Sequence, residues 1–154
     1  MDYPETKEVI VRIPMSFVFT YLHFLSFITL ACLLAGEFFL LRNPLNASTL
    51  KLVKKIDTAY GIVAGLVLAT GIARIYLEKG WEYYSGSHIF WTKMALFILM
   101  AVVSIYPTIR FIKAKTEADF EVQHYISTKK AILTQLLLIP LILFCAIWMA
   151  RGMY

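Results

Sequence analysis

The chain has 154 residues, of which 60% are hydrophobic and 16% charged, with a mean hydropathy of +0.70. A soluble domain of this length has too little interior to bury so much apolar surface. The composition therefore excludes a small soluble enzyme and predicts a chain that is surrounded by the lipid bilayer. The net charge of +5 does not indicate nucleic-acid binding, because the basic residues lie in short loops beside apolar segments. Anionic lipid headgroups are the expected counter-charge.

Four apolar segments are each long enough to cross the hydrocarbon core as an α-helix, which needs roughly 20 residues. They cover about residues 14–41, 57–77, 88–109 and 131–150. We therefore expect an all-α integral membrane four-helix bundle that forms a single membrane domain over residues 1–154.

The segments between these expected helices carry signals for turns, caps and interfaces. Residues 46–48 (Asn-Ala-Ser) match a glycosylation sequon, but in a short basic loop we interpret them as a helix cap. Residues 80–87 are rich in Tyr, Trp, Gly and Ser, which predicts a loop at the membrane interface. Pro107 is expected to disturb the last turn of the third helix and Pro140 to kink the fourth.

Lys and Arg residues are divided unequally between the two sides of the expected bundle. The loops after the first and third helices hold nine of them and the opposite side holds five, while Lys93 lies inside the third helix. The positive-inside rule then predicts a multi-pass membrane protein with both termini outside the cytoplasm, which in a bacterial inner membrane is the periplasmic side.

Small residues in the second helix predict close helix packing. Gly61 and Gly65 form a GxxxG pattern, which lets two helix backbones approach each other. We expect this surface to pack within the bundle. A homo-oligomer or a larger membrane complex is the alternative.

Few ionisable side chains lie within the expected helices, and each costs roughly 2.5–3.5 kcal/mol near the bilayer centre. They are His23, Glu37, Asp57, Arg74 and Lys93. The topology places the histidine and the two basic residues in the outer half of the bundle. An imidazole can ligate heme iron while Lys and Arg neutralise two propionates. The same arrangement also suits another flat anionic tetrapyrrole or a quinone-like substrate.

Each of these residues also has a structural interpretation. His23 would be hydrogen-bonded to Ser16, Thr20 or Ser26, which lie on its own helical face. The two basic residues would reach the headgroups by snorkelling along apolar surface.

The two acidic residues lie at the inner end of the bundle. Asp57 lies near Arg42 and Lys55 in the sequence, and Glu37 is expected on the same side. These residues would form either an ion-pair network or an entry route for protons.

Five short segments carry a family resemblance: residues 35–42 (AGEFFLLR), 57–61 (DTAYG), 90–94 (FWTKM), 104–108 (SIYPT) and 149–152 (MARG). Together they resemble an uncharacterised four-helix bacterial inner-membrane family. That family is distantly similar to the HemJ-type protoporphyrinogen oxidases and to the copper-resistance D domain.

HemJ-type enzymes are heme-binding inner-membrane proteins with a characteristic first-helix His and third-helix Lys. The resemblance assigns these roles to His23 and Lys93, and so implies heme b with His23 as the metal ligand and Lys93 as a catalytic residue. From their charge, we expect Arg74 and Arg151 to join Lys93 in binding the heme propionates. The HemJ-type third helix usually has a His two residues before its Lys, where this chain has Trp91.

Two functional hypotheses follow from the sequence. The first is a heme-b or porphyrin-binding membrane redox protein of the protoporphyrinogen oxidase type, and hence an oxidoreductase. The second is a non-catalytic accessory subunit of a membrane complex, or a small carrier.

Overall fold

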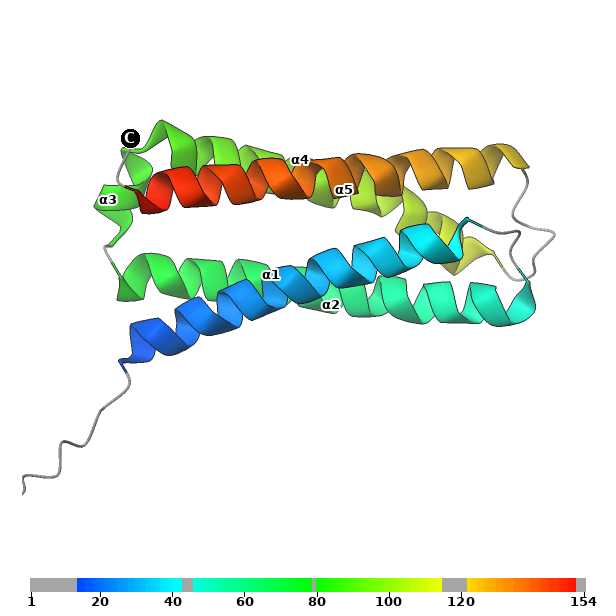
Figure 1. Cartoon of the computed structure of the whole chain (residues 1–154), viewed down its shortest axis with the longest axis horizontal. Helices are drawn as coiled ribbons and strands as arrows, with labels where there is room; N and C mark the ends of the chain where they lie inside the picture. Colours follow the sequence, from blue (N-terminus) through cyan, green and yellow to red (C-terminus); the bar gives the residue numbers. More distant parts are fainter. Residues whose placement is uncertain (1–13, 43–45, 79, 115–121, 152–154) are drawn as a thin grey trace, which may run out of the picture.

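The computed structural model describes residues 14–42, 46–78, 80–114 and 122–151. Within these ranges the chain forms four long helices and one short helix, and no strand. The helices are α1 (Met15–Leu40), α2 (Ala47–Leu77), α3 (Trp81–Ser85), α4 (His88–Lys113) and α5 (Val122–Ala150). The long helices run side by side (Figure 1), which confirms the all-α bundle.

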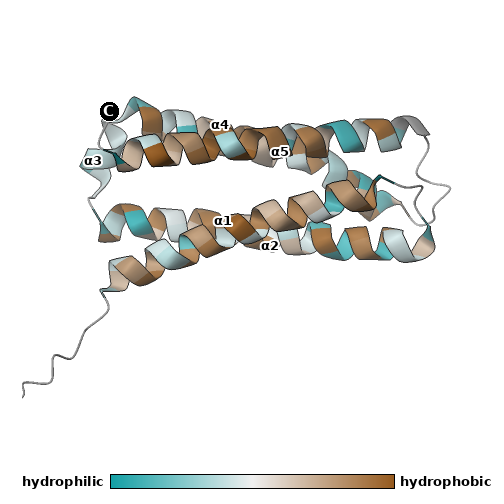
Figure 2. Cartoon of the chain, in the orientation of Figure 1, coloured by the Kyte–Doolittle hydropathy of each residue, from teal (hydrophilic) through white to brown (hydrophobic). Residues whose placement is uncertain are grey.

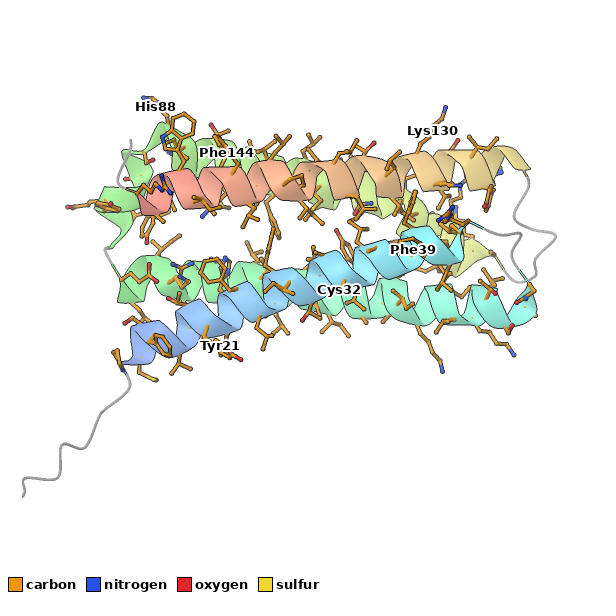
Figure 3. All side chains as sticks on the ribbon, viewed as in Figure 1. Tyr21, Cys32, Phe39, His88, Lys130 and Phe144 are labelled. Atoms are coloured by element: carbon orange, nitrogen blue, oxygen red, sulfur yellow. The ribbon has the colours of Figure 1, made fainter. Side chains whose placement is uncertain are left out.

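All four long helices are long and apolar enough to cross a membrane. The shortest, α1 and α4, have 26 residues each, and at about 1.5 Å per residue they exceed the ~30 Å hydrocarbon core. Figure 2 shows hydrophobic residues along the middle of the long helices. Large apolar side chains such as Tyr21, Phe39 and Phe144, labelled in Figure 3, are more than half exposed. The chain is a multi-pass membrane protein whose outer surface faces lipid.

The bundle consists of two helix pairs. α1 packs along α2 and α4 packs along α5, while contacts between the pairs are sparser. We call the end that carries α3 the α3 end and the opposite end the distal end. Most of the side chains that are at most 1% exposed lie in the distal half of the bundle, among them Leu34, Leu41, Val53, Phe111 and Ile132.

Two of the expected helix boundaries are wrong because polar residues extend the helices beyond the apolar segments. α2 begins at Ala47 rather than near residue 57, since Asn46 accepts a hydrogen bond from the Thr49 backbone N–H at 2.8 Å and caps the helix. This confirms the interpretation of residues 46–48 as a cap. α5 likewise begins at Val122, well before residue 131.

Pro107 does not end α4, which continues to Lys113. The expected loop at residues 80–87 contains the short helix α3. Gly80 precedes this helix and has a backbone φ of 81°, which residues other than glycine rarely adopt. Ser87 then caps α4 by accepting a hydrogen bond from the Phe90 backbone N–H at 3.3 Å.

The glycines of the GxxxG pattern do not pack within the bundle, contrary to expectation. Gly61 and Gly65 are exposed, and a Cβ placed on either one would meet no atom within 4 Å. The pattern therefore faces lipid on the outside of α2. Gly71 instead makes the close contact inside the bundle.

Candidate functional site

Two adjoining cavities, of about 100 and 270 Å³, lie between the two helix pairs at the α3 end. The residues that line both are His23, Phe27, Arg74, Tyr84, Lys93, Ile142 and Met149. The larger cavity also includes Phe24 of α1 and Leu143 of α5, which are both exposed on the outer surface. This cavity therefore reaches the surface between α1 and α5. Its volume is close to the lower limit of small-molecule sites, roughly 300 Å³.

His23 is held against α2 through one nitrogen of its ring. Nδ1 lies 3.1 Å from the Val67 carbonyl oxygen and 3.1 Å from Thr70 Oγ1. Because a carbonyl oxygen can only accept, Nδ1 carries a hydrogen, and the neutral imidazole has its lone pair on Nε2. Nε2 has no hydrogen bond to any residue that the structure describes. The expected partners on α1 are wrong, since the ring bonds across to α2.

Gly71 makes room for this imidazole. A Cβ at this position would lie 3.2 Å from His23 Cε1 and 3.6 Å from Nδ1, which is tighter than ordinary packing. Thr70 is fixed in turn, because its hydroxyl donates to the Leu66 carbonyl oxygen at 2.6 Å. The ring plane and the hydrogen-bonded nitrogen of His23 are therefore set by one turn of α2.

Arg74 makes a bidentate ion pair with Glu78, with Nε–Oε1 at 2.7 Å and Nη2–Oε2 at 3.1 Å. Thr20 and Tyr84 also donate to this carboxylate, at 2.7 and 2.9 Å. Partial burial raises the pKa of Glu78, but these three donors outweigh it and hold the pKa below its usual range. The Glu78 carboxylate thus neutralises much of the Arg74 charge. The sequence analysis missed Glu78, although its i,i+4 spacing from Arg74 is a signal for such a pair.

Lys93 has no carboxylate partner among the described residues. Its side chain is half-buried and lines both cavities, with Nζ 5.7 Å from the centroid of the Phe90 ring. The Arg74 guanidinium lines the same cavities, and its positive charge repels the Lys93 ammonium. A half-buried ammonium beside a second cation favours an anionic group in the cavity.

The structure brings His23, Arg74 and Lys93 together but leaves Arg151 apart. Arg151 follows the last turn of α5, is exposed, and lines neither cavity. Of the four residues that the sequence analysis proposed for cofactor binding, the structure therefore brings three to the cavities, while a role for Arg151 stays a prediction.

Two methionines that the sequence analysis did not single out also line the site. Met149 borders both cavities and Met94 borders the smaller one. Trp91 is half exposed and donates from its indole nitrogen to the Ser85 carbonyl oxygen at 2.9 Å, so its side chain faces α3. A histidine at this position, as in the HemJ-type pattern, would lie on that face of α4.

No cluster of three or more His, Cys, Asp or Glu side chains that could hold a metal ion occurs in the described part of the chain. Zinc sites use three or four such protein ligands.

The model of the family described as "Predicted membrane protein (DUF2214)" matches residues 15–154. The chain belongs to this family. The matched range includes all five helices, and the family description names neither a ligand nor a reaction. No curated protein and no solved structure matches the chain, and no finding supports the resemblance to the HemJ-type enzymes or to the copper-resistance D domain.

Proposed function

We propose that this protein binds a heme-b or porphyrin tetrapyrrole in the α3-end cavities and acts as a membrane redox protein. The observation that carries the proposal is the orientation of His23. Its Nδ1–H is fixed by the Val67 carbonyl oxygen, which leaves Nε2 with a lone pair and no partner among the described residues. A backbone carbonyl on the opposite ring nitrogen is the usual arrangement for a metal-ligating histidine.

The remaining residues of the site suit the other parts of a tetrapyrrole. Lys93 and Arg74 lie where they would pair with propionate carboxylates, and Lys93 is the better candidate because Glu78 already binds Arg74. Phe27, Ile142 and other apolar side chains line the cavities and suit a flat macrocycle. A bound heme would supply one-electron chemistry. Met149 and Met94 line the same cavity, and the thioether of either one would be able to help hold the iron of a bound heme.

We also propose that the protein lies in a bacterial inner membrane with both termini in the periplasm, since Lys and Arg are in excess at the distal ends of the four long helices. In that orientation the α3-end cavities lie in the periplasmic half of the bilayer. A reporter that is active only in the periplasm, fused after Tyr154, tests this orientation. Activity of this fusion is expected, and activity of a cytoplasmic reporter at the same position would reverse the assignment.

The proposal is tested by the absorption spectrum of protein purified in mild detergent and titrated with hemin. Wild type and a His88→Ala control, in which an exposed histidine at the start of α4 is removed, should both show a Soret band. His23→Ala should lose or shift this band while remaining helical. A wild-type spectrum that remains that of free hemin in the same detergent would overturn the proposal.

Substitutions at Lys93 test how the protein binds the porphyrin carboxylates, independently of how it binds the iron. Lys93→Ala should weaken the binding of an iron-free dicarboxylic porphyrin about tenfold, whereas Lys93→Arg should retain most of it. The alternative is a non-catalytic accessory subunit or a carrier. It predicts that the protein binds no tetrapyrrole and co-purifies with a partner, and that His23→Ala causes little change in activity.

A further inference from the structure

Buried polar side chains from all four long helices meet in the distal half of the bundle, away from the cavities. Glu37 of α1, Asp57 and Tyr60 of α2, and Gln135 of α5 are each at most 6% exposed. Thr108 of α4 joins them through its hydroxyl. We call these five residues the distal polar cluster. Polar groups in a bilayer-spanning interior are costly, so their convergence at one place calls for a ligand or a function.

Hydrogen bonds within the distal polar cluster satisfy some of its members. The Thr108 hydroxyl donates to Asp57 Oδ1 at 2.8 Å, and the Tyr60 hydroxyl donates to Gln135 Oε1 at 2.9 Å. Glu37 is 1% exposed, and no residue that the structure describes forms a hydrogen bond with its Oε1. The carboxyl group of Glu37 is close enough to Asp57 and Tyr60 to interact with both electrostatically.

No cation neutralises the two carboxyl groups within the described part of the chain. The expected ion pairs of Asp57 or Glu37 with Arg42 and Lys55 are wrong, since both basic residues are exposed and neither forms a salt bridge with Asp57 or Glu37. They lie on the outer side of their helix ends, where water and headgroups solvate them better than a buried carboxylate would.

The other charged or titratable side chains nearby have different partners. Lys54 donates to the Ala114 carbonyl oxygen, and Tyr125 of α5 donates to the Leu41 carbonyl oxygen. The Lys129 ammonium lies over the rings of Phe38 and Tyr125, at 5.8 and 5.9 Å from their centroids. The Arg110 guanidinium of α4 lies over the Tyr106 ring. None of these groups forms an ion pair with Glu37 or Asp57.

Two ionised carboxylates at this depth would repel each other and would each lose their hydration without compensation. A small cation must therefore accompany them. A sodium ion needs several free oxygen ligands, whereas Gln135 Oε1 already accepts the Tyr60 hydroxyl and Asp57 Oδ1 already accepts Thr108. A proton needs only one oxygen, and Glu37 Oε1 is without a partner.

We propose that Glu37 and Asp57 form a proton-binding site in which Glu37 carries the proton and Asp57 is the anion. This assignment follows from the hydrogen-bond donors. Thr108 stabilises a charge on Asp57, while no described residue donates to the carboxyl group of Glu37. The site does not depend on the ligand proposed for the α3 end.

Infrared spectroscopy of the purified protein in lipid tests this site. A carboxylic acid C=O band should be present at pH 7, shift in D₂O, and disappear in Glu37→Gln. It should remain in Asp57→Asn and in the control Glu82→Gln, which removes an exposed carboxylate on α3. A band that is absent from the wild type, or that persists unchanged in Glu37→Gln, overturns the proposal.

Two measurements on the unaltered chain keep the test independent of whether the variants fold. Labelling glutamate alone with ¹³C should shift the carboxylic acid band, whereas labelling aspartate alone should not. Addition of sodium chloride in place of potassium chloride should change neither the band nor the thermal stability. Loss of the band together with a higher Tm in sodium chloride would show that the site binds a sodium ion rather than a proton, and would overturn the proposal.

Discussion

The two ends of this bundle are built on the same four helices but differ in charge and in packing. The α3 end has two basic side chains and a histidine around open cavities. The distal end has two acidic side chains within a filled interior, where Leu34 and Ile132 are fully buried. The difference indicates that the helix pairs are held together mainly at the distal end, which leaves the α3 end free to accept a ligand.

Paired leucine substitutions give the largest test of this difference in packing. Leu34→Ala, at a fully buried position, should lower the free energy of unfolding by about 2–5 kcal/mol because it leaves a cavity. Leu143→Ala, at a position 39% exposed beside the larger cavity, should cost less than about 1 kcal/mol. Denaturation in detergent, followed by circular dichroism, measures both. Equal losses would show that the two ends are packed alike.

Glycine substitutions on α2 sharpen the comparison at the α3 end. Gly71→Ala should displace the His23 ring, since the new Cβ would lie 3.2 Å from Cε1, and should weaken heme binding about tenfold. Gly65→Ala is the matched control, because its Cβ meets nothing within 4 Å, and it should leave heme affinity unchanged. Hemin titrations followed at the Soret band compare the two. Equal heme affinities in the two variants would show that the position of the His23 ring does not affect heme binding.

The smallest expected effect concerns the ion pair that borders the α3-end cavities. Glu78→Gln should lower stability at pH 7 by roughly 0.2–1 kcal/mol, as for partly exposed ion pairs. Because the folded pKa of Glu78 lies below its unfolded value near 4.3, this contribution is present above about pH 4.3 and is lost as the pH falls through the folded pKa. Wild type and variant should therefore converge in Tm at low pH.

The matched control for that titration is Glu82→Gln, whose carboxylate is exposed on α3. Its Tm should follow the wild type at every pH. A gap between wild type and Glu78→Gln that stayed constant down to pH 3 would show that the carboxylate acts by packing rather than by charge.

Hydropathy was sufficient to predict the number and order of the spans, because lipid immersion imposes a length and a composition on each helix. It failed at helix ends, where capping by Asn46 and interfacial lysines extend α2 beyond its apolar segment. It could not orient the GxxxG face, because a small residue suits a protein contact or a lipid contact equally well.

The sequence placed His23, Arg74 and Lys93 at the same depth, and the structure puts them around the same cavities. It did not reveal that Val67 binds Nδ1, since the partner is a backbone atom and leaves no mark in the side-chain pattern. Tyr84 and Met149 line the site because of how α3 and α5 are rotated about their axes relative to the other helices. The hydrophobic periodicity of a single helix carries no information about this rotation.

The opening between Phe24 and Leu143 lies on the lipid-facing surface of the bundle. A hydrophobic molecule would therefore reach the cavity by diffusing within the plane of the bilayer, without crossing water. Its occupancy would depend on its mole fraction among the lipids, and a large detergent micelle would dilute it. Titrations in nanodiscs should accordingly give tighter apparent binding than titrations in excess detergent.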